Sequence, residues 1–542
     1  MMIMLNMDRI IEKRYGIRFK IFQTQFLIFL RWIMKLDRTN NAFRNMKFGM
    51  VNKIVTLFLP FIIRTVLIKT IGMEYAGLNS LFSSILQVLN LSELGFSSAV
   101  VYSMYRTIAE NDDRQVGALL LFYKKVYRII GLVVLSVGLI IMPFLPKLVE
   151  GGYPPDINVY ILYLIYLLDT VVSYFLFAYK SAILNAHQRV DIVSNILTIT
   201  QGAMNLVQII MLIAFKNYYC YIIWMPLFTI LNNIMTAYCV NKLFPQYHCE
   251  GKISRDQLSD MKYKISGLMV NKLCLTTRNT LDSVFISAFM GLTVSAIYGN
   301  YYYILNAVIG LISIVSSAML AGVGNSIETE SVEKNYNDLK KFNFLYMWLS
   351  GWCAICMLCL TQPFMTIWMG KDNLFPFGVV VLICIYFYVL KMGDMRGLYS
   401  DAAGLWWQNR YRAISESILN LVLNYVLVQV WGIYGIIIAT LISLFFINFL
   451  GGSGIVFKHY FKNGKFIEFL KYHFFYMLIT VINASICVFL TNFVKYEGII
   501  GLGLRAIICV IIPNVIYALV YLNISELRQQ SKWVLSKLKV RR

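Results

Sequence analysis

The residues that could bind a ligand are charged and polar side chains inside long apolar segments. Arg64 lies in the first such segment, and Lys272 and Arg278 share the seventh. An ionisable side chain in a membrane interior costs roughly 2.5–3.5 kcal/mol, so it normally faces a cavity or a partner. We therefore interpret these three residues as cavity cations suited to phosphate groups. The alternative for Arg64 is a side chain that extends to the outer headgroups.

Two acidic residues inside apolar segments are candidates for a switch. Arg278 and Asp282 lie four residues apart on one helical face, a spacing that predicts an ion pair. We expect Asp282 to hold Arg278 away from a ligand in one conformation. A salt bridge with no role in ligand binding is the alternative. Asp169 in the fourth segment is a second candidate, unless it pairs with a neighbouring cation.

Further polar residues recur at helical spacing within the apolar segments, so each set shares one helical face. Hydroxyls and amides suit sugars, which offer both hydrogen-bond donors and acceptors. Polar contacts between helices are the alternative reading. We expect the following residues to line the cavity: Gln87, Asn90, Glu93, Asn205, Gln208, Asn271, Asn420 and Asn424.

The composition shows what must position these residues. The chain has 542 residues, of which 59% are hydrophobic and 14% charged. A soluble globular enzyme, a disordered chain and a disulfide scaffold are excluded. Apolar runs near 20 residues long predict about 14 transmembrane helices in an all-α membrane bundle.

Charge fixes the expected orientation. If the N-terminus is cytoplasmic and the segments alternate, the cytoplasmic side receives 39 of the 49 Lys and Arg residues and the outer side five. This asymmetry predicts that both termini are cytoplasmic. Basic patches that face anionic lipid also account for the net charge of +22, so nucleic acid is not an expected partner.

The segments suggest two lobes of six helices each, followed by two further helices. We expect a basic interfacial segment at 1–47, an N-lobe at 48–243, a cytoplasmic loop at 244–264 and a C-lobe at 265–458. The last two helices occupy 471–522, and 523–542 form a basic cytoplasmic tail. A weak repeat at an offset of 218–219 residues aligns Gly72 with Gly291, and chance similarity between apolar helices is the alternative.

Catalytic and metal sites are not expected. Cys353, Cys356 and Cys359 share an apolar segment without His or acidic partners, so we interpret them as packing residues. The expected outer loops are short and carry no His. No cofactor and no covalent chemistry are required by this pattern.

Several segments resemble the bacterial polysaccharide-transporter flippases of the multidrug/oligosaccharidyl-lipid/polysaccharide exporter superfamily. These segments are 64–79, 91–105, 282–287, 402–405 and 420–424, and Glu93-Leu94-Gly95 is the most specific motif. The resemblance implies two lobes around a cavity that opens alternately to each side. It implies export of undecaprenyl-pyrophosphate-linked oligosaccharide repeat units across the bacterial cytoplasmic membrane for cell-surface polysaccharide or exopolysaccharide assembly. Membrane lipid and other polysaccharide-assembly proteins are the implied partners.

Three other functions compete with export of a lipid-linked sugar. A cation-coupled drug exporter of the same superfamily would favour a cavity dominated by acids. A polytopic polysaccharide polymerase or glycosyltransferase would need acids, His or Arg at one membrane face, usually on a sizeable loop. A lipid-binding scaffold of similar fold would not transport. The residues favour the flippase, because the membrane interior holds five Lys and Arg residues and four acids.

Overall fold

The protein is an all-α membrane bundle, as predicted. The computed structural model describes residues 59–90, 96–253, 255–462 and 464–523, and these form helices and no strand. Within this part, ten helices are long and apolar enough to cross a membrane. The count becomes eleven if Val159–Phe175 and Ala178–Ala186, which meet at a bend of 50°, form one span.

The predicted count of about fourteen includes segments that the structure joins or describes only in part. The helix Met269–Thr329 covers two predicted spans. Gly291 separates them, since its φ of 83° and ψ of 175° break the helical backbone. The first predicted span is described from residue 59, where a helix runs to residue 70. The second is divided between two helices on either side of residues 91–95, which lie outside the described residues.

The first group of helices follows the helix at 59–70. Their apolar side chains form one core, with Tyr123, Tyr163 and Leu212 fully buried in it. The helices are α4 (Met73–Leu89), α5 (Phe96–Ala109), α6 (Asp113–Ile141), α7 (Val159–Phe175), α8 (Ser181–Ala186), α9 (Val190–Phe215), α10 (Tyr218–Ile222) and α11 (Trp224–Leu243).

The second group builds a separate core that includes Tyr336, Phe387 and Tyr517. The last two helices pack into this core through Tyr476 and Cys509. The helices are α12 (Arg255–Thr329), α13 (Val332–Met369), α14 (Phe377–Met392), α15 (Asp394–Ala402), α16 (Trp406–Trp431), α17 (Ile433–Ile442), α18 (Gly452–Val456), α19 (Phe466–Asn492) and α20 (Gly498–Asn523). Two π-helical turns, Ser443–Gly451 and Phe457–Phe461, flank α18.

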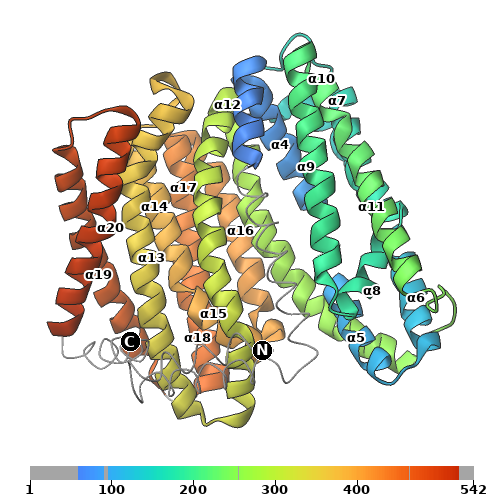
Figure 1. Cartoon of the computed structure of the whole chain (residues 1–542). Helices are drawn as coiled ribbons and strands as arrows, with labels where there is room; N and C mark the ends of the chain where they lie inside the picture. The colour runs from blue at the N-terminus through green and yellow to red at the C-terminus, as the bar shows by residue number, and fades with distance from the viewer. Residues whose placement is uncertain (1–58, 91–95, 254, 463, 524–542) are drawn as a thin grey trace, which may run out of the picture.

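The two groups meet where α4 packs on α12, near the end of the bundle that is predicted to be outer. A Cβ on Gly77 would lie 2.2 Å from the main-chain oxygen of Leu292, so only glycine allows this approach. Leu292 and Ala296 of α12 are accordingly buried in the first core. Figure 1 shows the two groups together at this end, with α9 and α11 diverging from α13 toward the opposite end.

The weak internal repeat has a structural counterpart. Gly72 precedes α4 with φ 117° and ψ 171°, and Gly291 interrupts α12 with φ 83° and ψ 175°. L-residues with a side chain rarely adopt these backbone angles. Both positions therefore need glycine, which explains why it recurs at this point of the two half-sequences.

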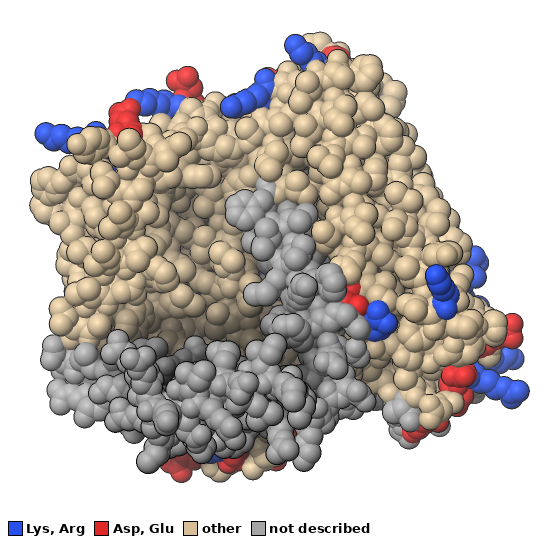
Figure 2. All heavy atoms as spheres, viewed as in Figure 1, with Lys and Arg blue, Asp and Glu red and all other residues tan. Residues whose placement is uncertain are grey.

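The described charged side chains leave a broad uncharged band on the face shown in Figure 2. On the face shown in Figure 2, Lys, Arg, Asp and Glu gather mainly along the upper edge and at the lower right. The band between them fits contact with lipid. The predicted interfacial segment 1–47 and most of the predicted tail 523–542 lie outside the described residues.

Candidate functional site

A cationic cavity of about 870 Å³ lies within the second group of helices, between α12, α14, α15 and α16. Its wall contains Asn271, Lys272 and Arg278, three residues that the sequence predicted to share a cavity. Serine side chains from the second half of α12, including Ser313 and Ser317, line another part of the wall. The cavity thus combines cations with small neutral polar groups.

The cations outnumber the acids at this site. The cavity wall holds five Lys and Arg residues and the carboxylates of Asp394 and Asp401, and Glu416 lies directly behind it. The five cations are Lys272, Arg278, Lys391, Arg396 and Arg412. Five cations against three carboxylates leave a positive excess at a buried site, so the arrangement favours an anionic ligand.

Glu416 holds two of these arginines. Arg278 forms an ion pair with Oε1 of Glu416, and Arg412 Nη1 lies 2.6 Å from Oε2. Asn448 Nδ2 donates to the same Oε2 at 2.9 Å. The side chains of Arg278 and Glu416 are only 2% and 7% exposed. Since one carboxylate serves two guanidinium groups, one positive charge remains uncompensated in this triad.

The predicted ion pair between Arg278 and Asp282 is wrong for this conformation. Asp282 accepts hydrogen bonds from Asn424 Nδ2 at 2.9 Å, from Tyr298 at 3.4 Å and from Thr440 at 3.4 Å. Spacing on one helix predicted only a neighbour along the chain. The tertiary structure brings α16 alongside α12, so that Glu416 of α16 forms the ion pair with Arg278 in place of Asp282.

Three of the cavity cations, Lys391, Arg396 and Arg412, were missed as site residues. Lys391 lies 2.8 Å from Oδ2 of Asp394 and is almost fully buried. Arg396 Nη2 donates to the main-chain and side-chain oxygens of Asn448, both at 3.1 Å, and its Nε has no partner among the described atoms. The sequence placed all three in a cytoplasmic loop. Lys391 lies at the end of α14, Arg396 in α15 and Arg412 near the start of α16, and the packing of these helices brings the three side chains to one cavity.

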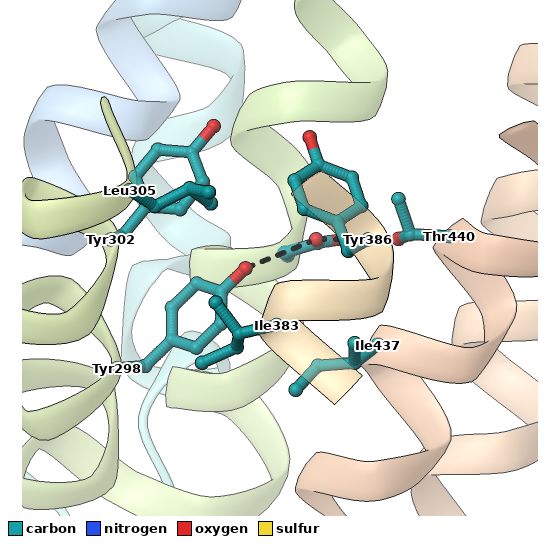
Figure 3. Close-up of a pocket in the computed structure, with 8 residues that line it drawn as sticks. Tyr298, Tyr302, Leu305, Ile383, Tyr386, Ile437 and Thr440 are labelled. Atoms are coloured by element: carbon teal, nitrogen blue, oxygen red, sulfur yellow. Dashed lines mark hydrogen bonds between the residues drawn. The ribbon is translucent and has the colours of Figure 1, made fainter. Parts of the chain in front are cut away.

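Asp282 lines a small pocket of about 10 Å³, which is near the minimum space for one water molecule. Figure 3 shows the hydroxyl-bearing side chains of Tyr298, Tyr302 and Tyr386 opposite Thr440. Carboxylate and hydroxyl oxygens together form a donor set that suits a hard cation or a proton. The described residues contain no cluster of three His, Cys, Asp or Glu.

Asn420 and Asn424 support this pocket, which corrects their expected place in the wall of the large cavity. Asn420 Nδ2 donates to Thr440 Oγ1 at 3.1 Å, and Asn424 donates to Asp282. Both asparagines are buried. They share one face of α16 because that face contacts both the Asp282 carboxylate and Thr440 of α17.

Arg64 is buried between the two groups of helices and does not line the large cavity. Its Nε donates to Asn300, its Nη2 donates to the main-chain oxygen of Ala296 at 2.9 Å, and Nη1 lies 3.3 Å from Ser80 Oγ. The guanidinium also lies 5.0 Å from the centre of the Tyr303 ring. Arg64 therefore connects the first helix to the second half of α12.

The remaining predicted site residues of the first group are mostly engaged in local contacts. Asn90 accepts from Tyr174 at 2.8 Å, and Gln208 donates to the Tyr221 main chain at 3.1 Å. Asp169 accepts from Thr229 at 2.6 Å. Two others complete the set: Asn205 is buried and Gln87 is exposed. Glu93 lies outside the described residues.

Comparison with known proteins identifies the fold. No protein-family model matches the chain. No curated protein sequence matches either. Among solved structures, the inward closed conformation of the lipid II flippase MurJ superposes with a TM-score of 0.62 at 15% identity, covering 88% of this chain and 98% of that one. The chain shares the fold of transporters of the MOP superfamily.

Two other structures show the same architecture. An inward-facing multidrug resistance MATE family transporter gives a TM-score of 0.57 at 13% identity, covering 78% of this chain and 99% of that one. A MOP superfamily transporter from Pyrococcus furiosus, whose structure is described as having a binding pocket of reversed polarity, gives 0.54 at 13% identity, covering 78% and 97%. The likeness concerns the arrangement of the helices.

Proposed function

We propose that this protein is a flippase. Its substrate is an undecaprenyl-pyrophosphate-linked oligosaccharide repeat unit, which it moves from the inner to the outer leaflet of a bacterial cytoplasmic membrane by alternating access. The observation that carries this proposal is the cavity of about 870 Å³ lined by five Lys and Arg residues. The pyrophosphate and sugars must cross about 30 Å of hydrocarbon, whereas the polyprenyl chain can stay in lipid.

The cations supply the phosphate-binding part of the cavity. Lys272 forms no ion pair with another described residue, and Arg396 is bonded to the oxygens of Asn448 rather than to a carboxylate. A pyrophosphate accepts charge-assisted hydrogen bonds from guanidinium and ammonium groups. When it enters, it competes with Glu416 for Arg278 and Arg412. In the empty cavity, Glu416 therefore neutralises part of the positive charge of Arg278 and Arg412. When the substrate leaves, Glu416 pairs with these arginines again, which favours release.

The neutral part of the wall suits sugar hydroxyls. Asn306, Ser313, Ser316 and Ser317 lie along one stretch of α12, on the wall of the same cavity as the cations. Amide and hydroxyl groups both donate and accept hydrogen bonds, so they can satisfy a sugar without requiring one fixed pattern. This division of the wall matches a ligand with an anionic end and a neutral polar end.

Alternation requires that the two groups of helices separate at their present contact. Arg64 stabilises this contact through Asn300 and the Ala296 main chain, and Trp368 adds a hydrogen bond of 2.6 Å to Thr65. We assign Arg64 to the closed outer gate in this conformation. When the gate opens, Arg64 loses these partners and becomes available to an anionic substrate.

Asp282 is the proposed coupling residue. Its carboxylate lies in a small pocket with Tyr298 and Thr440, one helical turn from Arg278. Binding of a proton or cation there would change the charge close to the substrate cations. Asp169, held by Thr229, is the second candidate.

A drug exporter of the same superfamily is the second candidate function, because MATE transporters share the fold. The excess of cations in the cavity favours an anionic substrate over the cationic drugs that an acidic cavity would bind. A reconstituted assay tests the choice. The purified protein in proteoliposomes should move a fluorescent pyrophosphate-linked oligosaccharide between leaflets, and should not move a cationic dye. Dye transport without lipid transport would favour the drug exporter.

A further inference from the structure

A second, smaller cavity lies at the end of the bundle where α19 turns into α20. Its volume is about 510 Å³, and its walls come from α13, α14, α19 and α20. It shares no lining residue with the cationic cavity between α12 and α16. Figure 1 places α13 beside the red pair α19 and α20 along the edge of the bundle, away from the contact between the two groups.

The cavity has a charged mouth and an apolar interior. Lys371, Glu497 and Arg505 belong to its wall near the ends of the helices. Leu358 of α13 lies eleven residues before the helix end at Met369, which is about 16 Å at 1.5 Å per residue. Val488 of α19 adds to the apolar wall. Such a shape fits an amphiphile whose head stays at the interface and whose chain follows α13.

Arg505 provides the main argument for an anionic head. It lies in α20, where its Nη2 donates to the main-chain oxygen of Val494 at 2.8 Å and its Nη1 lies 3.5 Å from that of Tyr496. No carboxylate of the described residues forms an ion pair with it. The main-chain oxygens solvate part of the guanidinium but leave its positive charge uncompensated, and a cation at the edge of a membrane span favours an anionic partner. The open side of the cavity supplies room for one.

A second cation lies at the same mouth in an easily broken pair. Lys371 lies 3.5 Å from Glu497, and the two side chains are 72% and 82% exposed. An exposed ion pair of this kind contributes little, so a phosphate can replace the carboxylate. Both signs of charge gather at the upper left corner of Figure 2, where the α19–α20 connection lies in Figure 1.

The neutral polar groups in the wall suit a head that also donates hydrogen bonds. Thr366 donates to the Gln362 main chain at 2.9 Å, and Thr491 donates to the Cys487 main chain at 2.9 Å. Each hydroxyl oxygen keeps a lone pair for a further donor. A phosphodiester bearing free hydroxyls would satisfy the cations and these oxygens together.

We propose that this cavity binds the head of an anionic phospholipid with a hydroxyl-bearing phosphodiester, in the leaflet at the α19–α20 end. Phosphatidylglycerol has this chemistry. The site is independent of the proposed transport substrate, because it shares no residue with the cationic cavity. It would hold the last two helices against α13 through a lipid rather than through direct contacts alone.

Native mass spectrometry of the purified full-length protein tests this assignment, with phosphatidylglycerol, phosphatidylcholine and inorganic phosphate as separate probes. Phosphatidylglycerol should bind the wild type more tightly than phosphatidylcholine does. Arg505→Gln should weaken its binding about tenfold, since a charge-assisted hydrogen bond is lost. Lys371→Gln should weaken it about twofold, as expected for an exposed charge. Lys216→Gln, which removes an exposed lysine elsewhere at the same end, should leave binding unchanged.

Two further variants separate binding from folding. Arg505→Lys keeps the charge and should retain most of the binding. Val488→Trp fills the cavity without touching a charge and should abolish it. Equal binding of phosphatidylglycerol to wild type, Arg505→Gln and Val488→Trp would overturn the proposal. Displacement of the lipid by millimolar inorganic phosphate would also overturn it, because the site would then recognise free phosphate.

Discussion

Arg278 and Glu416 form a buried ion pair that joins α12 to α16 at the wall of the cationic cavity. A second arginine shares the same carboxylate, with Arg412 Nη1 at 2.6 Å from Oε2. Removing one member of a buried pair typically costs about 3–5 kcal/mol, because the remaining charge is left uncompensated. An anionic ligand that replaces Glu416 as the partner of Arg278 can therefore switch the pair between a closed and an open state.

Glu416→Gln should tighten substrate binding about tenfold and slow transport, since both arginines then turn to the pyrophosphate and release becomes harder. Binding of purified lipid-linked substrate and flipping in proteoliposomes measure the two effects. Glu468→Gln, which removes an acid paired with Lys340 away from the cavity, is the matched control.

Arg278→Ala should weaken substrate binding, and the double variant Arg278→Ala/Glu416→Gln should lose the gain that Glu416→Gln shows alone. Contacting residues are typically coupled by about 0.5–3 kcal/mol in such a cycle. If the two single effects simply add, Glu416 does not act through Arg278 and the switch is disproved.

Arg64→Ala should open the outer gate. The change leaves Asn300 and the Ala296 main chain without the guanidinium that links them, so a cysteine at Ser80 should react faster with a membrane-impermeant reagent added outside. Arg64→Lys should show a smaller increase, because it keeps the charge and loses the forked geometry.

Gly299→Ala gives an independent test of the same gate, since its Cβ would lie 2.6 Å from Arg64 Nη2. We expect a smaller increase in labelling at Ser80 than Arg64→Ala gives. Gly202→Ala, where a Cβ would meet no atom within 4 Å, is the control. Unchanged labelling in both Arg64→Ala and Gly299→Ala would show that this contact does not close the gate.

Asp282→Asn should leave substrate binding within about threefold and remove the response of transport to an imposed proton or cation gradient. The amide preserves shape but not charge, and the proposed coupling role requires the buried carboxylate of Asp282 to take up a proton or cation. Asp169→Asn should retain the response. A gradient response that survives Asp282→Asn and disappears in Asp169→Asn would transfer the coupling role to Asp169.

His187 should make stability depend on pH. Its ring stacks on Phe244 with 4.1 Å between centroids, and its Nε2 lies 3.0 Å from the Tyr247 hydroxyl. Burial lowers the pKa of His187 from its usual 6.5. The unfolded chain takes up this proton at a higher pH than the folded protein does. Its contribution to stability is therefore complete above about pH 6.5 and declines as the pH falls.

His187→Phe should flatten the fall in melting temperature between about pH 7 and pH 5, because the ring remains and the titration does not. His248→Gln, at an exposed position nearby, should keep the wild-type dependence. Parallel pH curves for wild type and His187→Phe would contradict this account.

The topology can be checked by labelling single cysteines. Positions Asp156 and Glu497 should react from outside, and Arg255 and Glu333 from inside, since 39 of the 49 Lys and Arg residues fall on one side in the predicted arrangement. Reaction of the Arg255 position from outside would invalidate the predicted order from the sixth span onward.

The sequence by itself determined that this protein lies in a lipid bilayer and that its fold is all-α. Apolar runs of membrane length require helices in a bilayer, because every backbone N–H and C=O must be paired within the span. It also placed Lys272 and Arg278 at a cavity, since a charge in such a segment needs a cavity or partner. Gly72 and Gly291 could be paired as a repeat because both positions require glycine.

Only the tertiary structure decided which charges meet. Spacing along α12 predicted Asp282 as the partner of Arg278, but Glu416 on α16 takes this place and Asp282 turns to Asn424 and Thr440. The tertiary structure likewise added Lys391, Arg396 and Arg412 to the cavity wall, although the sequence predicted a cytoplasmic loop there. Side-chain partners across helices depend on rotation and crossing of the helices, which sequence periodicity does not contain.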